Sequence, residues 1–291
     1  MYLTFFINSI NNMLKTISNK KTNLKLKVKS KMRNFFREVL DKLRLLDKSF
    51  LDTGFKKSIK EKLVSENFDK ASEKFVKIGW AYLENPIENK VYQDIIKTWP
   101  NKLFFNPYPT ETKIQDVGFK WGSFMSQKQK AKNLKYLNSF SGLRDFYSYI
   151  RSKVFCERVR KLMQINEEIC CYYISSRVSR SGGKLDFHMD GAGSIKELKN
   201  KAINIVWHIN GVNGSKTGGL CLSNNKDIIA SWPKGLIHES QKLKNSCLIY
   251  DMTNDIGIYH GYPPMNSDTF RWVITSQFWP KSCLSIKSEV H

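Results

Sequence analysis

The sequence predicts an α+β protein with a mostly β core, a jelly roll of short strands supported by helices from the N-terminal part. From Ile169 onward, short strand-like runs alternate with turns rich in Gly, Asn, Ser and Pro, which is typical of a jelly roll. Before that point, apolar residues recur at helical spacing over Leu143–Leu162. A chain of 291 residues with 41% hydrophobic and 13% aromatic residues can bury the core of such a domain.

The chain divides into two predicted parts, a basic leader with an amphipathic helix over residues 1–50 and the jelly-roll domain over residues 51–285. The helix is expected near residues 34–48, where Phe35, Phe36, Val39, Leu40, Leu43 and Leu46 follow helical spacing. That apolar stripe favours packing against the domain, and a helix lying on a membrane surface is the alternative.

The remaining elements are predicted in chain order. The charged segment 57–74 is compatible with a helix, Phe75–Leu83 is expected to form the first strand, and Glu88–Trp99 a helix. Residues 101–138 are rich in Asn, Lys, Pro and aromatic residues without a clear period. We expect loops with short strands there, placed as the walls of a binding site.

The charge is strongly positive, +22 in total, and it is concentrated near the N-terminus. Between Lys20 and Lys48, eleven Lys and Arg residues face three acidic ones. Such a segment can attract nucleic acid or an anionic membrane surface. A solvated lysine-rich leader is the competing interpretation, because no aromatic residues that would stack on bases lie between Lys20 and Arg33.

The six cysteines show no Cys-x-x-Cys pair and no spacing typical of a secreted disulfide framework. We therefore expect reduced thiols in a cytoplasmic protein. No apolar run is long enough to span a bilayer, and the first residues lack the basic region and cleavage site of a signal peptide.

A metal site is predicted from His188, Asp190 and His260. His188 and Asp190 are two residues apart, so on a strand both side chains point to the same side. His260 ends a later strand-like run at a glycine and can supply a second imidazole. Two histidines and one carboxylate form the facial set that holds Fe(II) in non-heme oxygenases. Arg271, eleven residues further on, suits an acidic co-substrate.

Other residues compete for these roles. Asp186 also alternates with His188, so spacing alone leaves it open as the carboxylate ligand; the following Gly191-Ala-Gly193, where the chain can turn, favours Asp190. His208 lies in an apolar run, where a hydrogen-bonded core histidine is expected. His238 and His291 have no supporting residues around them.

Five short motifs, taken in order, resemble the Fe(II)/2-oxoglutarate-dependent oxygenase superfamily, and within it the prolyl-hydroxylase and phytanoyl-hydroxylase branches. The resemblance covers about residues 75–281. The motifs are Leu185-x-x-His188-x-Asp190, the run Val206–Asn210, the turn Gly218-Gly219-Leu220, the run Asn245–Asp251 ahead of His260-Gly261, and Arg271 followed by Trp272–Pro280.

The resemblance implies a double-stranded β-helix dioxygenase, an oxidoreductase that hydroxylates a small-molecule or peptide substrate. It implies Fe(II) held by the catalytic residues His188, Asp190 and His260, and 2-oxoglutarate bound by Arg271 and converted to succinate and CO₂. Ascorbate is a further candidate cofactor. Asp190 argues against the halogenating branch, in which a small residue stands at this position.

Two departures from the family pattern concern the co-substrate. Val273 stands where many members carry Ser or Thr, and the segment Arg177–Gly182 lacks a tyrosine often found there. Arg271 is then expected to be assisted by Tyr172 or Tyr173, or by water. Two alternatives stay open: an iron-dependent oxygenase that does not use 2-oxoglutarate, and a nucleic-acid-directed member, although no second arginine follows Arg271.

Overall fold

A computed structural model describes residues 63–101, 104–107, 115–190, 196–199, 201–224, 236–253 and 258–284. The predicted basic leader, the helix near residues 34–48 and the domain boundaries at residues 50 and 285 lie outside the described residues. So do the glycines that follow Asp190.

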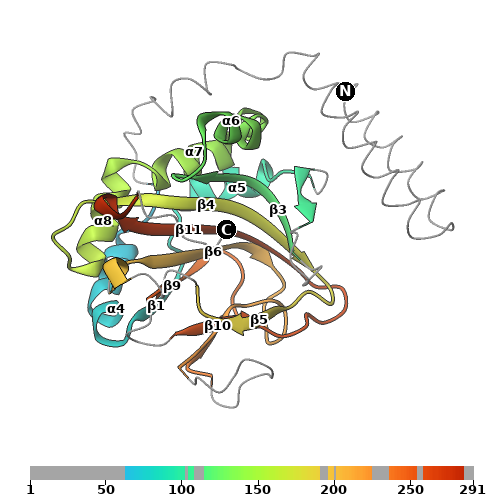
Figure 1. Ribbon diagram of the computed structural model, residues 1–291. Coiled ribbons are helices and arrows are strands. Elements are labelled where there is room, and N and C mark those ends of the chain that lie inside the picture. Colours follow the sequence, from blue (N-terminus) through green and yellow to red (C-terminus); the bar gives the residue numbers. More distant parts are fainter. Residues whose placement is uncertain are drawn as a thin grey trace. The chain divides into compact units, whose positions relative to one another are not determined.

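Two antiparallel sheets form the β core, in agreement with the predicted jelly roll (Figure 1). The larger sheet has seven strands in the order β1-β9-β6-β11-β4-β3-β2. Their bounds are β1 Trp80–Glu84, β2 Asn106–Pro107, β3 Gln115–Gly122, β4 Ile169–Arg180, β6 Ile203–Gly211, β9 Ser246–Asp251 and β11 Phe270–Pro280. The smaller sheet has the order β5-β10-β7-β8, with β5 Leu185–His188, β7 Cys221–Ser223, β8 His238–Glu239 and β10 Tyr259–Tyr262.

Helices cover one face of the larger sheet, and the smaller sheet lies on its other side (Figure 1). The α-helices are α4 Ser72–Ile78, α5 Asn89–Lys97, α6 Gln127–Leu134, α7 Ser141–Ile150 and α8 Lys153–Met163. Short 3₁₀ turns are η2 Glu66–Ala71, η4 Leu137–Ser139, η6 Lys196–Leu198 and η7 Lys281–Cys283. The predicted α+β class with supporting helices is therefore confirmed.

Trp207 on β6 anchors the helical layer. Its ring meets Phe68, Phe146 and Phe155 at centroid distances of 6.1, 5.3 and 5.9 Å, and its Nε1 donates to Ser276 Oγ at 2.9 Å. Since side chains alternate along a strand, the neighbours of Trp207 face the opposite way, into the space between the sheets. The larger sheet thus has a helix-covered face and a face that turns toward the smaller sheet.

The interior face of the larger sheet follows from the register of its central strands. On β11, Arg271, Val273, Thr275 and Gln277 alternate on one side; Val273 pairs with His208, and Gln277 with Asn204, on β6. Most of these side chains are polar and buried. A polar interior is unusual for a closed β core and points to a binding site there.

Several element predictions need correction. Phe75–Leu83 is not one strand: α4 continues to Ile78, Gly79 ends it in the left-handed conformation at φ 76°, and β1 begins at Trp80. The segment Leu143–Leu162 contains two helices, α7 and α8. Ser152 is the N-cap of α8, and its side chain accepts a hydrogen bond from Phe155 N. The helix expected over Glu88–Trp99 is confirmed as α5.

The stretch expected as loops with short strands, residues 101–138, contains longer elements. β3 runs for eight residues along β4, and α6 follows it. A capping box begins α6, in which the Ser126 side chain accepts from Gln129 N and the Gln129 side chain accepts from Ser126 N.

The six cysteines are all free, and five of them are buried. Among the described residues, no helix combines the length and the apolar character needed to cross a bilayer.

Candidate metal centre

His188 and His260 lie directly opposite each other on neighbouring strands of the smaller sheet. The register of β5 and β10 pairs His260 with His188, and their ring centroids are 4.3 Å apart. Residues paired across antiparallel strands carry their side chains on the same face. Strand pairing therefore accounts for the approach of two imidazoles that are 72 residues apart in sequence.

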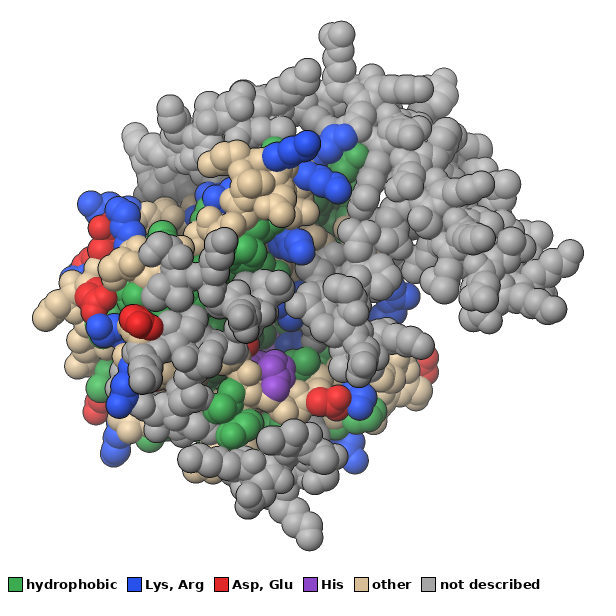
Figure 2. Space-filling model, in the orientation of Figure 1, with side chains coloured by type: hydrophobic (Ala, Val, Ile, Leu, Met, Phe, Trp, Pro, Cys, Tyr) green, Lys and Arg blue, Asp and Glu red, His purple; other side chains and the backbone are tan. Residues whose placement is uncertain are grey.

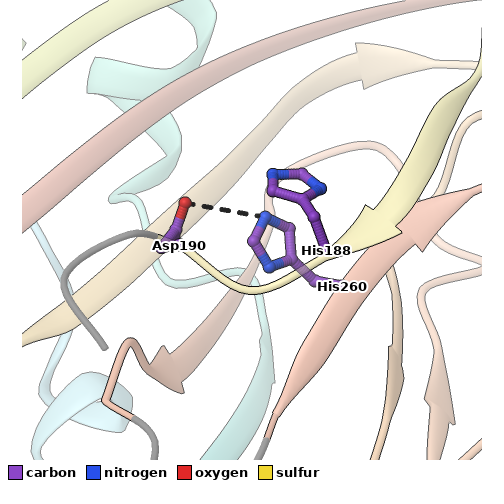
Figure 3. A group of neighbouring side chains, drawn as sticks. All are labelled: His188, Asp190 and His260. Atoms are coloured by element: carbon purple, nitrogen blue, oxygen red, sulfur yellow. Dashed lines mark ion pairs between the residues drawn. The ribbon is translucent and has the colours of Figure 1, made fainter. Parts of the chain in front are cut away.

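Asp190 completes the group from just beyond the end of β5 (Figure 3). One ligand atom from each of His188, Asp190 and His260 lies within 4.8 Å of the other two. Asp190 Oδ1 is 3.8 Å from His260 Nε2. Three neutral or anionic donors converging on one point match the ligand types and number that a facial metal site requires.

Asp186 points away from this group, and a β-bulge is the reason. Between the pairs His260–His188 and Tyr262–Leu185, three steps along β5 oppose two along β10, so the strict alternation of β5 is broken. The Asp186 carboxylate is exposed and pairs with Lys184 Nζ at 2.9 Å. Only the backbone carbonyl of Asp186 takes part, accepting from His188 Nδ1 at 2.8 Å.

That backbone contact determines which nitrogen of His188 is available. A carbonyl can only accept, so Nδ1 carries the proton and Nε2 keeps its lone pair. His260 presents Nε2 toward Asp190. Both imidazoles can therefore offer Nε2 to a metal.

The second oxygen of Asp190 is held by the larger sheet. Tyr250 on β9 donates its hydroxyl to Asp190 Oδ2 at 3.1 Å, and Asn204 on β6 donates Nδ2 to the same oxygen at 3.2 Å. Asn204 Nδ2 also donates to Tyr250 OH at 2.8 Å. These bonds fix the carboxylate and leave Oδ1 toward the histidines.

The protonation states of the group favour metal binding. Burial acts to raise the pKa of Asp190, but the nearby histidines and the hydrogen bonds from Asn204 and Tyr250 outweigh it and hold the pKa below its ordinary value. Burial lowers the pKa of His260 to about 3, against the attraction of Asp190. At neutral pH the carboxylate is thus ionised and His260 is neutral, the forms that act as ligands.

Arg271 lies on β11, inside the β core. It is 3% exposed, and its guanidinium stands 4.6 Å from the ring centroid of Tyr262, two residues after His260 on β10. Within the described residues Arg271 forms no ion pair, and its Nε has no hydrogen-bond partner. Burial lowers the pKa of Arg271, and a hydrogen bond with Tyr262 acts against that shift. A buried guanidinium without an anionic partner among the described residues suits an anion.

A tyrosine that was not expected, Tyr262, lies at Arg271. Tyr172 stacks on Trp279 at a centroid distance of 3.5 Å, and Tyr173 pairs across the strands with Gln277. Tyr262 OH also shares a 3.0 Å hydrogen bond with Ser179 Oγ. The Gly218-Gly219 turn approaches the Arg271 side chain closely, because a Cβ at Gly218 would lie 3.1 Å from Arg271 Cδ.

The buried polar atoms without hydrogen-bond partners provide a test of whether these residues fit a bound group. Seven of the ten such atoms in the described residues belong to β6, β10 and β11, the strands around this site: Asn204 Oδ1, His208 Nδ1 and Nε2, His260 Nδ1, Arg271 Nε, Gln277 Oε1 and Trp279 Nε1. Buried polar groups are partnered in native proteins. The residues therefore fit a polar, anionic ligand beside a metal ion.

His208 and His238 differ from expectation. His208 is a core residue as predicted, at 0% exposure, but neither ring nitrogen has a partner in the described part of the chain. His238 lies on β8 between Trp80 and Tyr82, each 4.9 Å away by ring centroids, and its Nε2 shares a hydrogen bond with Ser240 Oγ at 3.1 Å.

Three residues of the site were not predicted from the sequence: Asn204, Tyr250 and Tyr262. Each belongs to a run that was expected to be a strand. The available signal was a polar side chain within an apolar strand, as Asn204 is between Ile203 and Ile205.

The site reaches solvent on one side. His188 is exposed, whereas His260 is 4% exposed. On the face of the molecule drawn in Figure 2, histidine atoms come to the surface beside hydrophobic side chains. A ligand can therefore approach from the side of His188.

Comparison with known proteins gives matches among solved structures alone. No family model matches the sequence, and no curated protein matches it. One match is an oxidoreductase of the 2OG-Fe(II) oxygenase family from Burkholderia pseudomallei. The similar region covers 75% of this chain and 93% of that protein, with 7% sequence identity and a TM-score of 0.50.

Two further structures have lower TM-scores. A Pseudomonas putida prolyl-4-hydroxylase is 12% identical over 74% of this chain and 99% of its own, with a TM-score of 0.44. HygX from Streptomyces hygroscopicus, solved with nickel and 2-oxoglutarate bound, is 8% identical over 73% of this chain and 87% of its own length, with a TM-score of 0.48. The chain has the double-stranded β-helix fold of the 2OG-Fe(II) oxygenase family.

Proposed function

We propose that this protein is an Fe(II)- and 2-oxoglutarate-dependent dioxygenase. One observation carries the proposal: His188, Asp190 and His260 converge within 4.8 Å, and the buried Arg271, which forms no ion pair within the described residues, lies beside Tyr262, two residues further along the same strand as His260. A metal and an anionic co-substrate would thus be held side by side in one polar interior.

Each residue has a distinct part in this proposal. His188 and His260 would hold Fe(II) through Nε2 and Asp190 through Oδ1. When bound, Fe(II) with 2-oxoglutarate and O₂ supplies the oxidation that inserts one oxygen atom into a C–H bond, the other oxygen leaving in succinate as CO₂ is released.

Arg271 would bind the distal carboxylate of 2-oxoglutarate. Its guanidinium is planar and permanently charged, and it offers a bidentate pair to a carboxylate. Burial strengthens that pair, because the local dielectric constant is far below that of water. Val273, Leu222 and Leu248 are buried apolar neighbours that exclude water from the interior.

The proposed substrate is a small molecule or peptide that enters from the side of His188. The exposed imidazole leaves that side of the group open, whereas β6, β9 and β11 close the other. A nucleic-acid substrate is less favoured, because β11 carries no second arginine.

The experiment is to supply metal-free protein with Fe(II), ascorbate, O₂ and 2-oxoglutarate and to measure succinate, with and without pools of small molecules and peptides. We expect succinate from the wild type and none from His188→Ala or His260→Ala, with circular dichroism showing that both variants fold. Asp186→Ala is the matched control and should stay active, because its carboxylate is exposed and bonded to Lys184.

Arg271→Ala tests the co-substrate separately from the metal. It should raise the 2-oxoglutarate concentration needed for half-maximal turnover at least about 30-fold, since truncating one partner of a buried charge pair costs about 2 kcal/mol or more. Its Fe(II) affinity should be retained. Oxygen consumption without succinate in the wild type would favour the iron-dependent oxygenase that does not use 2-oxoglutarate.

A further inference from the structure

His208 is the buried polar side chain that the proposed chemistry leaves unexplained. It is 0% exposed, and within the described residues neither Nδ1 nor Nε2 has a hydrogen-bond partner. Leaving buried donors and acceptors unpaired destabilises the folded protein. A histidine kept in this state in the middle of a long central strand therefore points to a partner that binds there.

The position of His208 shows what that partner can be. Asn204 and His208 lie on the same face of β6, because side chains four residues apart in a strand share a face. Asn204 contacts Asp190, so this face turns toward the metal group. Burial lowers the pKa of His208, and the charge of Arg271 lowers it further.

The cross-strand register places His208 next to the residue that follows Arg271 on the same face of β11. His208 on β6 pairs directly with Val273 on β11, two residues after Arg271. Val273 stands where many members of the family that the sequence resembles carry Ser or Thr, whose hydroxyl assists the arginine. Valine cannot donate a hydrogen bond, and the side chain lying against it is an imidazole with a free N–H.

We infer that His208 is a positioning residue for the co-substrate, donating an N–H to the distal carboxylate that Arg271 binds, in the role that a hydroxyl at residue 273 would have. This inference rests on the proposed use of 2-oxoglutarate. A neutral imidazole carries one N–H and one lone pair, so one ring nitrogen can donate to the carboxylate. Burial lowers the pKa of His208 well below 6.5, so the ring is neutral at physiological pH.

Arg177 is the competing donor. It pairs with Val273 from the other side, on β4. Arg177 is, however, half-buried, and its Nε already donates to Ser175 Oγ at 3.3 Å. His208 is fully buried and has no hydrogen-bond partner within the described residues, so it is favoured over Arg177 as the donor to the carboxylate.

The test measures binding and needs no turnover. Wild type, His208→Leu, His208→Leu/Val273→Thr and Arg177→Met are loaded with Fe(II) without oxygen, and their affinities for 2-oxoglutarate and for 2-oxobutanoate are measured by titration calorimetry. 2-Oxobutanoate keeps the 2-oxo acid end but lacks the distal carboxylate.

We expect His208→Leu to raise the dissociation constant of 2-oxoglutarate roughly 10- to 100-fold, as for loss of one hydrogen bond to a charged group. Its affinity for 2-oxobutanoate should not change. Val273→Thr in the same chain should restore much of the 2-oxoglutarate affinity by returning a hydroxyl donor. The melting temperature of ligand-free His208→Leu should be equal to that of the wild type or higher, because an unpartnered polar group is replaced by an apolar one.

Three results would overturn the inference while leaving the proposed function intact: unchanged 2-oxoglutarate affinity in His208→Leu, an equal loss for 2-oxobutanoate, or a selective loss in Arg177→Met alone. Failure of the wild type to bind 2-oxoglutarate with Fe(II) present would instead reject the proposed co-substrate, and the role of His208 with it.

Discussion

The two oxygens of Asp190 have different surroundings, and this difference can be tested at the level of single residues. Oδ1 faces His260, whereas Oδ2 is bonded to Tyr250 and Asn204. Asp190→Asn keeps the shape but removes the charge. It should abolish measurable Fe(II) binding, while Asp186→Asn should bind Fe(II) like the wild type. Loss of Fe(II) affinity in Asp186→Asn alone would reverse the assignment of the carboxylate ligand.

Tyr250 should matter for metal affinity although it does not reach the metal position. Removing its hydroxyl in Tyr250→Phe frees Asp190 to rotate. The dissociation constant for Fe(II) should then rise roughly 10- to 100-fold, the usual effect of losing a bond that orients a metal ligand. Tyr82→Phe is the matched control, because the Tyr82 hydroxyl donates to the Lys242 carbonyl. Equal affinities for Tyr250→Phe and wild type would show that Asn204 alone suffices.

At this scale, the sequence predicted the residues that the structure brings together as a possible metal site, but not those that orient them. His188, Asp190 and His260 stand out because their types and spacing are specific to metal binding. Asn204, Tyr250 and Tyr262 act through contacts between strands far apart in the chain, and these depend on a register that local patterns do not contain.

At the scale of elements, Gly261 controls the pairing of β5 with β10. A Cβ at this position would lie 2.6 Å from the Leu185 carbonyl oxygen and 2.8 Å from Phe187 Cδ2. Gly261→Ala should push β10 away from β5, destabilise the protein by about 1–3 kcal/mol and weaken Fe(II) binding. Chemical denaturation and metal titration measure the two effects.

Gly182→Ala is the control for that prediction. Gly182 has φ 75° and nothing within 4 Å of an added Cβ, so alanine brings backbone strain of about 1–2 kcal/mol without a clash. It should lose stability and keep its Fe(II) affinity. Equal metal affinities in both variants would mean that strand separation does not limit metal binding.

The elements also show where local patterns fail. The β-rich half was predicted because apolar strand-like runs are separated there by turn residues, although β4 and β11 are longer than expected, at 12 and 11 residues. The strand expected over Phe75–Leu83 was wrong because Gly79 allows a left-handed helix end inside the apolar run. β3 and α6 were missed in a region rich in Asn and Lys, although the capping pair Ser126 and Gln129 was readable there.

For the whole molecule, three buried or half-buried histidines predict acid sensitivity of the metal-free protein. Burial lowers the pKa of His260 to about 3, that of His238 to about 4 and that of His208 well below 6.5. The unfolded chain binds protons at all three sites near pH 6.5, and the folded chain does not. Stability is therefore fully present above pH 6.5 and is lost as the pH falls below it.

The expected slope between pH 6 and pH 5 is about 4 kcal/mol per pH unit, from three protons taken up on unfolding. Urea denaturation at several pH values measures it. His208→Leu should reduce the slope to about two thirds. A slope that is the same in this variant would show that His208 is protonated in the folded state.

The attachment of Asp190 to the larger sheet has a consequence for the lifetime of the protein in a cell. His188 and His260 belong to the smaller sheet, whereas the Asp190 carboxylate is fastened to β6 and β9. A metal bound by all three residues would link the two sheets, and loss of the metal would remove that link from β5 and β10. Iron starvation would then expose these strands to proteases, so the amount of protein, as well as its activity, would follow the supply of ferrous iron.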